Sequence, residues 1–206
     1  GVVAAVLGLG LAAGDVKSGL AAAFYAAHHV MVKGALFLAV GVAAAGARGR
    51  RAWVLAPALL LCLGLGGLPF TGGAIAKFAV RDACATRLPA ALSAASAAGT
   101  TLLMLHFLRR LVLVEVYGDG RAPAGLMLPW LVMAGAALLL PWMLYAPAGL
   151  GAAAAAIELD AAWKALWPVA LGAALAISLR GRADRLPAVP EGDIAAGIEP
   201  AARTLV

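Results

Sequence analysis

The fold is decided by residues 20–46, which read LAAAFYAAHHVMVKGALFLAVGVAAAG. At about 1.5 Å per helical residue, this run is long enough to cross the ~30 Å hydrocarbon core of a bilayer. Inside lipid the backbone must satisfy its own hydrogen bonds, and a long apolar run favours a helix over the alternating pattern of a barrel strand. Its only formally charged side chain is Lys33, and it also holds His28 and His29. The run therefore predicts a transmembrane helix that carries ionisable groups at membrane depth.

The composition extends this prediction to the whole chain. Its 206 residues are 64% hydrophobic and 13% charged, with a mean hydropathy of +0.97, whereas a soluble domain is about half apolar and about a quarter charged. The net charge of +6 comes from few basic residues, many of which flank apolar runs as membrane loops require. We therefore expect a multi-pass membrane protein in contact with the lipid bilayer and no nucleic-acid partner. Cys62 and Cys84 match no metal spacing, so we expect neither a metal nor a redox role for them.

Further apolar runs predict an all-α, polytopic transmembrane bundle of about six or seven helices. The bundle is expected over residues 1–180, followed by a polar, proline-bearing tail at 181–206 that we expect to be disordered. The chain begins inside an apolar run without an initiator methionine, so we interpret it as a carboxy-terminal fragment. The predicted helical segments are 1–13, 18–46, 53–68, 74–86, 90–117, 125–147 and 161–179.

One of these helices is predicted to be broken. Residues 66–73 read GGLPFTGG and separate two apolar helical segments. Membrane proteins tolerate such breaks where the backbone is buried in protein or lines a wet cavity. Lys77 stands in the helix that restarts, with Arg81 and Asp82 after it. Lys77 is thus either part of an ion path or a helix-end lysine that snorkels outward with its neighbours.

The orientation is ambiguous. The arginines of residues 48–51 and of residues 180–185 both favour the cytoplasmic side. A count of the predicted helices puts these two groups of arginines on opposite sides. One predicted segment must therefore be wrong, and we expect it to be the one near residues 149–162. There the alanine run 152–156 is either an interfacial helix or the start of a span.

Lys33 is the first candidate for ion chemistry. A charge at bilayer depth costs at least about 2.5–3.5 kcal/mol, so such residues are functional by default. His29 lies one turn earlier on the same helical face. Desolvation favours a neutral lysine and histidine titrates near neutral pH, so the pair could exchange protons. The alternative for Lys33 is a structural pair with an acid elsewhere. His28 points roughly 100° around the helix from His29, so we expect it to have a packing role. His106, taken alone, also favours a structural role.

Three stretches resemble one family. Residues 24–41, FYAAHHVMVKGALFLAVG, resemble the H-x-x-x-K-x-x-L-F-L-x-x-G helix of the antiporter-like membrane subunits of respiratory complex I, Mrp cation/proton antiporters and membrane-bound hydrogenases. Residues 66–78, GGLPFTGGAIAKF, are similar to the family's G-x-P-x-x-x-G-F-x-x-K break, with Ala74 in place of the Phe. Residues 105–109, LHFLR, are similar to its Y-x-L-R, with His106 in place of the Tyr. The resemblance covers about residues 1–118.

The resemblance implies a role for each matching residue. Lys33 matches the mid-membrane relay lysine, His29 the histidine one turn before it, and Lys77 the lysine that connects the relay to one side of the membrane. His28, His106 and Asp82 are possible secondary members. The family's Glu–Lys pair belongs to its front half, outside this stretch.

The function this implies is proton, or sodium/proton, translocation in a bacterial or archaeal inner membrane. The chain would act as a subunit of an NADH:quinone oxidoreductase-like, hydrogenase or Mrp-type complex. The partners are other membrane subunits, and no cofactor or catalytic chemistry is expected in this chain. Two alternatives are a structural or assembly subunit whose polar groups only join helices, and a small-solute transporter, for which a polar substrate pocket would be required.

Overall fold

The computed structural model describes residues 16–46, 52–83, 90–117 and 120–180, without the side chains of residues 82, 83 and 90. Within these residues all regular secondary structure is helical, which confirms the predicted all-α membrane bundle. The chain divides into two units, residues 1–176 and residues 177–206. In the second unit the described residues are 177–180, the last turn of a helix. The expected helix at 1–13 and tail at 181–206 lie outside the described residues.

Six α-helices and one short 3₁₀ helix make up the described chain. Four α-helices are long and apolar enough to cross a membrane: α2, α5, α6 and α7. The predicted segments that fall within the described residues thus form helices, although the predicted ends often run a few residues too far. The elements are α2 (Val16–Ala45), α3 (Ala52–Gly66), α4 (Gly72–Ala83), α5 (Ala90–Val112), α6 (Ala124–Leu144), η2 (Ala153–Ile157) and α7 (Leu159–Arg180).

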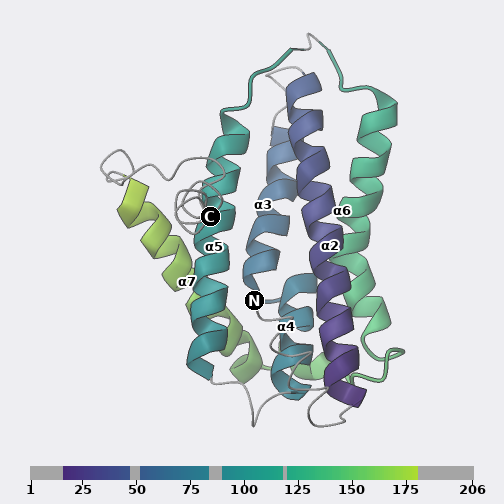
Figure 1. The fold of residues 1–206 in the computed structure, drawn as a ribbon, viewed down its shortest axis with the longest axis vertical. Helices are drawn as coiled ribbons and strands as arrows, with labels where there is room; N and C mark the ends of the chain where they lie inside the picture. Colours follow the sequence, from purple (N-terminus) through teal and green to yellow (C-terminus); the bar gives the residue numbers. More distant parts are fainter. Residues whose placement is uncertain (1–15, 47–51, 84–89, 118–119, 181–206) are drawn as a thin grey trace, which may run out of the picture. The chain divides into compact units, whose positions relative to one another are not determined.

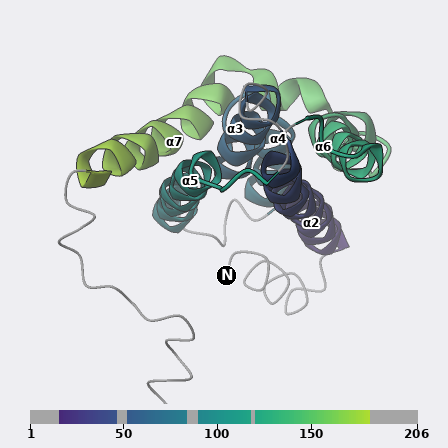
Figure 2. The same cartoon turned by 90° about the horizontal axis from the view of Figure 1, so that it is seen from above.

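The broken pair α3 and α4 lies at the centre of the helices. Figure 1 shows α2, α3, α5 and α6 running side by side, with α4 beyond the lower end of α3. Seen from above, α3 and α4 lie between α5, α2 and α6 (Figure 2). One apolar cluster, which includes Leu36, Leu61 and Trp130, joins α2, α3 and α6. A second, which includes Tyr25, Ile75 and Tyr145, joins the start of α2 to α4 and to the residue that follows α6.

The helix predicted over residues 90–117 ends early. After Val112 the chain turns, and the backbone N–H of Tyr117 donates to the carbonyl of Ala44 at 2.9 Å. This hydrogen bond to the end of α2 takes the place of a further turn of α5. The largely apolar sequence of residues 113–117, LVEVY, predicts a longer helix because it gives no sign of this tertiary contact.

The order of the helices resolves the orientation conflict. The expected error near residues 149–162 is not there, because this segment holds only the five-residue η2 and the start of α7. With 15 and 12 residues, α3 and α4 are each too short to cross ~30 Å alone and together make one interrupted crossing. Counted as one crossing, α3 and α4 leave four crossings between the arginines of residues 48–51 and those of residues 180–185, so the helix count no longer puts them on opposite sides.

The break between α3 and α4 should not tolerate a Cβ at Gly73. An added Cβ there would overlap the carbonyl of Gly64 in α3, whereas a Cβ at Gly99 of α5 meets nothing within 4 Å. We expect Gly73→Ala to lower the free energy of unfolding by about 1–3 kcal/mol, as overpacking does. Gly99→Ala should be neutral or slightly stabilising. Thermal unfolding in detergent measures both, and equal melting temperatures would contradict the packing described here.

Candidate functional site

The break at residues 67–71 is a built turn. The N–H of Gly67, at φ 101°, donates to the carbonyls of Leu63 and Gly64 at 3.0 and 2.8 Å, and this closes the end of α3. The hydroxyl of Thr71 donates to the carbonyl of Leu68 at 2.6 Å and accepts from the N–H of Ala74 at 3.4 Å. Thr71 therefore caps the start of α4. The two helix ends are satisfied locally, so the interruption is a fixed feature.

Lys77 folds back onto this turn. From α4 its ammonium donates to the carbonyl of Gly66, the last residue of α3, at 2.5 Å. A Cβ on Gly67 would lie 2.9 Å from Cδ of Lys77, so only glycine leaves room for the lysine stem. A cation at the carboxyl end of a helix is favoured by the free carbonyls and the helix dipole there. The amine thus lies at the break and not at the outer end of α4.

His28 faces the other side of the break. It is 3% exposed. A Cβ on Gly72 would lie 3.2 Å from its Nε2, and a Cβ on Gly73 would lie 3.3 Å from its Cε1. Its Nδ1 is buried and has no hydrogen-bond partner among the described residues. Buried polar atoms without a protein partner are usually served by water, so this imidazole, which we expected to have a packing role, also has a free atom for proton exchange.

His29 connects His28 to Lys33. The two imidazole rings have centroids 6.5 Å apart, and the His29 ring lies 4.5 Å from that of Tyr25. Nδ1 of His29 is likewise buried with no partner among the described residues. The charge of Lys77 acts on both histidines, and that of Lys33 acts on His29. The structure therefore places Lys77 of α4 near both histidines of α2, and Lys33 near His29. We call Lys33, His29, His28 and Lys77 the amine–imidazole row.

Lys33 differs from Lys77 in its enclosure. It is exposed, between Val30 and Phe37, which are 69% and 75% exposed. The described helices therefore enclose Lys77 at the break but leave Lys33 on the outer face of α2. The sequence analysis treated the two lysines alike, because helical spacing places side chains around one helix but does not show which face its neighbours cover.

Of the two remaining candidates, His106 lies apart from the row. His106 is exposed on α5 and is not among the groups that act on His28 or His29. Asp82 belongs to α4 by its backbone, but its side chain is outside the described residues. Cys62 is a buried free thiol in α3, and the described residues contain no group of His, Cys, Asp and Glu that could hold a metal.

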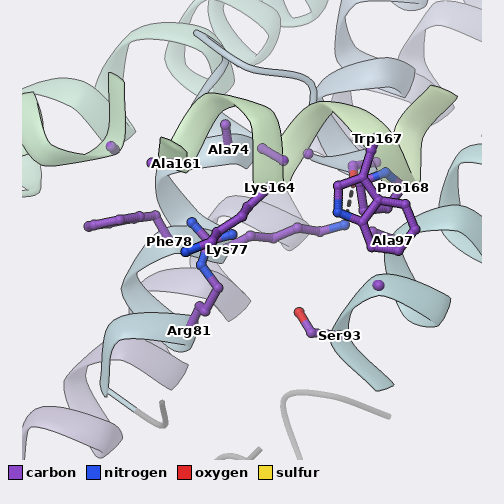
Figure 3. A pocket seen from close by; sticks show the side chains of 15 residues that line it. Ala74, Lys77, Phe78, Arg81, Ser93, Ala97, Ala161, Lys164, Trp167 and Pro168 are labelled. Atoms are coloured by element: carbon purple, nitrogen blue, oxygen red, sulfur yellow. Dashed lines mark hydrogen bonds between the residues drawn. The ribbon is translucent and has the colours of Figure 1, made fainter. Parts of the chain in front are cut away.

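A pocket of about 270 Å³ opens beside Lys77 (Figure 3). It lies between α4, α5, η2 and α7, and Gly66 and Gly67 form one wall. Arg81 and Lys164 line it together with Lys77. The sequence analysis noted Arg81 but missed Lys164, since only the packing of α7 brings this residue to α4. The closeness of Asp160 and Lys164 to the start of an apolar run was the one available signal.

Comparisons of the chain with protein families, curated proteins and solved structures find no match. The fold and the site thus define a class, a helical membrane protein with a broken helix and a row of ionisable groups. The likeness to antiporter-like subunits rests on the two sequence motifs.

The pocket beside Lys77 should admit water. Ser93 of α5 lines it and is partly exposed, whereas Ala98, five residues later, is 6% exposed and does not line it. In a chain with Cys84→Ser, we expect Ser93→Cys to react with a membrane-impermeant maleimide and Ala98→Cys to remain unlabelled. Labelling of right-side-out and inverted vesicles also reports which side the pocket opens to. Equal labelling of both variants would contradict this geometry.

Proposed function

We propose that this chain is a proton-translocating subunit of a larger membrane complex, in which Lys33, His29, His28 and Lys77 pass protons along the amine–imidazole row. Sodium in place of, or in exchange for, the proton is compatible with the same row. The resemblance to antiporter-like subunits supports the subunit role, and the partners we propose are other membrane subunits of a respiratory, hydrogenase or Mrp-type complex. Electron transfer, where the complex performs it, would belong to those partners.

The observation that carries the proposal is the pair of adjacent imidazoles between two lysines, with His28 buried and His29 half-buried. Proton transfer needs groups that can both accept and donate, and imidazole does so through its two nitrogens. His28 and His29 are adjacent, and each has a buried Nδ1 with no partner among the described residues. Lys77 is fixed at the break by the Gly66 carbonyl, where the pocket provides a route from the amine to the end of the bundle.

A proton would move by alternating charge on the row. Two neighbouring cations in a low-dielectric interior repel each other strongly, so a proton arriving on His29 disfavours one on Lys33 or Lys77. Transfer from Lys33 through the two imidazoles to Lys77 would relieve this repulsion stepwise, with water bridging gaps longer than a hydrogen bond. The exposed face of α2 requires that another segment or subunit cover Lys33, since an uncovered charge at membrane depth is costly.

The orientation follows from the arginines. With four crossings between them, the arginine-bearing residues 48–51 and 180–185 would lie on one side of the membrane. The positive-inside rule favours the cytoplasm for that side. Since α4 ends on the opposite side of the bundle from the loop at 47–51, Lys77 and its pocket would face away from the cytoplasm.

One observation favours a second candidate, a structural subunit. Because Lys33 lies on an outer face, it could bind a carboxylate of a neighbouring helix and serve only to join the two. The two roles differ in what happens when the charge is removed.

Replacement of Lys33 by methionine separates them. In membranes that contain the assembled complex, we expect Lys33→Met to reduce proton pumping by about tenfold or more, measured by quenching of a pH-sensitive dye, while a native gel shows the complex intact. Arg109→Met, an exposed residue at the far end of α5, is the matched control and should pump normally. Normal pumping by Lys33→Met would refute the relay. Loss of the complex in Lys33→Met, with both assembly and full pumping restored in Lys33→Arg, would favour the structural role.

A second pair of variants tests the imidazoles. We expect His28→Gln, which keeps a polar side chain of similar reach but cannot carry a proton at neutral pH, to slow pumping strongly. His106→Gln makes the same chemical change outside the row and should pump as the unaltered chain does. Comparable rates for the two variants would remove His28 from the path. Pumping in sodium-free and sodium-containing buffer, together with radioactive sodium uptake, identifies the ion.

A further inference from the structure

The pocket beside Lys77 holds two basic side chains, Arg81 and Lys164, that the amine–imidazole row does not use. Three of its lining side chains are basic, Lys77, Arg81 and Lys164, and no acidic side chain is among the described residues that line it. Figure 3 shows all three entering the space between α4 and α7, with Trp167 and Pro168 on the α7 wall. Like charges in a partly enclosed, low-dielectric space repel one another, so a bound anion would stabilise the arrangement.

Their hydrogen bonds in the structure leave the ammonium groups of Lys77 and Lys164 able to bind more. The ammonium of Lys77 donates to the Gly66 carbonyl, and that of Lys164 donates to Asp160 at 2.6 Å one turn earlier. An ammonium has three donors, so one bond does not saturate it. The guanidinium of Arg81 lies over the ring of Phe78, 5.5 Å from its centroid, and this contact orients it.

The position of the pocket favours a lipid. Arg81 is in the last turn of α4 and Lys164 is near the start of α7, and these two helix ends lie at the same end of the bundle (Figure 1). Both cations are therefore close to a membrane surface, the depth at which phospholipid phosphates lie. Trp163 and Trp167, 63% and 43% exposed on the same turns of α7, are residues typical of that level.

We infer that this pocket binds the phosphate of an anionic phospholipid. Arg81 and Lys164 would hold the phosphate at the membrane surface, and Lys77 would approach it from the interior of the bundle. Basic pockets between transmembrane helices bind anionic headgroups in this way. The volume of about 270 Å³ accommodates a headgroup but not the acyl chains, which would lie in the hydrocarbon along the apolar outer surface of α7. Asp160, 73% exposed and bound to Lys164, competes with the phosphate for that ammonium. Lys77 and this pocket also belong to the proposed proton route, so the lipid would lie at the outer end of that route; the contacts of Arg81 and Lys164 with the phosphate do not rest on proton transfer.

Lipid titration of the purified protein in detergent tests the site, with bound lipids counted by native mass spectrometry. We expect phosphatidylglycerol to bind at least about fivefold more tightly than phosphatidylcholine. The double substitution Arg81→Gln and Lys164→Gln should weaken phosphatidylglycerol binding by about fivefold for each lost charge. Asp160→Asn should strengthen it, because the substitution frees Lys164. Equal binding of phosphatidylglycerol by the double variant and the unaltered protein would overturn the inference.

Matched variants make the result specific. Arg109→Gln with Arg110→Gln removes two charges from the other end of α5 and should leave lipid binding unchanged; a loss as large as that of the pocket variant would show a general charge effect and overturn the site. Arg81→Lys with Lys164→Arg keeps both charges and should bind lipid, which shows that the glutamine pair acts through charge and not through misfolding. Complete displacement of the lipid by millimolar inorganic phosphate would identify a free-anion site and overturn the lipid assignment. Lys33→Met should bind lipid normally, so failure of the proton row and failure of this site are distinguishable.

Discussion

The close approach of backbones at the α3–α4 break is the constraint on which the site depends. Gly73 lies against the carbonyl of Gly64, and Gly72 lies against the Ala137 carbonyl of α6 and against His28 of α2. A side chain at either glycine would push α4 away from these helices. The two glycines thus fix where α4 begins, and with it the position of Lys77 four to five residues further on, next to the imidazoles. Composition and hydropathy explain why the chain is helical, but these contacts explain why a lysine and a histidine from different helices act on each other.

The helices and the interruption at residues 66–73 could be predicted because each depends mainly on the residues of its own segment. The apolar runs gave the helices, and the sequence of residues 66–73 gave the interruption with Lys77 after it. Glycine and proline act through the backbone of their own neighbourhood, so a break of this kind needs no knowledge of the fold. His29 and Lys33 were paired for the same reason, since one helical turn sets their spacing.

The remaining features depend on which faces meet, and one sequence does not contain that. The angle between His28 and His29 was known, but not that His28 would be the one turned toward the break. Lys164 joins the pocket only through the packing of α7, and the outward position of Lys33 depends on helices that leave that face of α2 open. The alanine run before α7 was ambiguous because alanine suits a span, an interfacial helix or a short 3₁₀ turn equally. Gly149 and Gly151, with φ values of 72° and 115°, turn the chain just before the run, and the run forms the short 3₁₀ helix η2.

The open face of α2 has a bearing on how such a protein comes together in the cell. A segment that supplies water or a carboxylate to Lys33 removes a cost of about 2.5–3.5 kcal/mol, which corresponds to roughly a hundredfold preference for the covered state over the bare one. Val30 and Phe37, on either side of Lys33 along α2, are apolar, so their burial costs about the same against lipid as against protein. In the proposed complex, this one side chain would therefore distinguish an unassembled chain from an assembled one, because the unassembled chain would carry an uncovered charge in the membrane until a partner bound it.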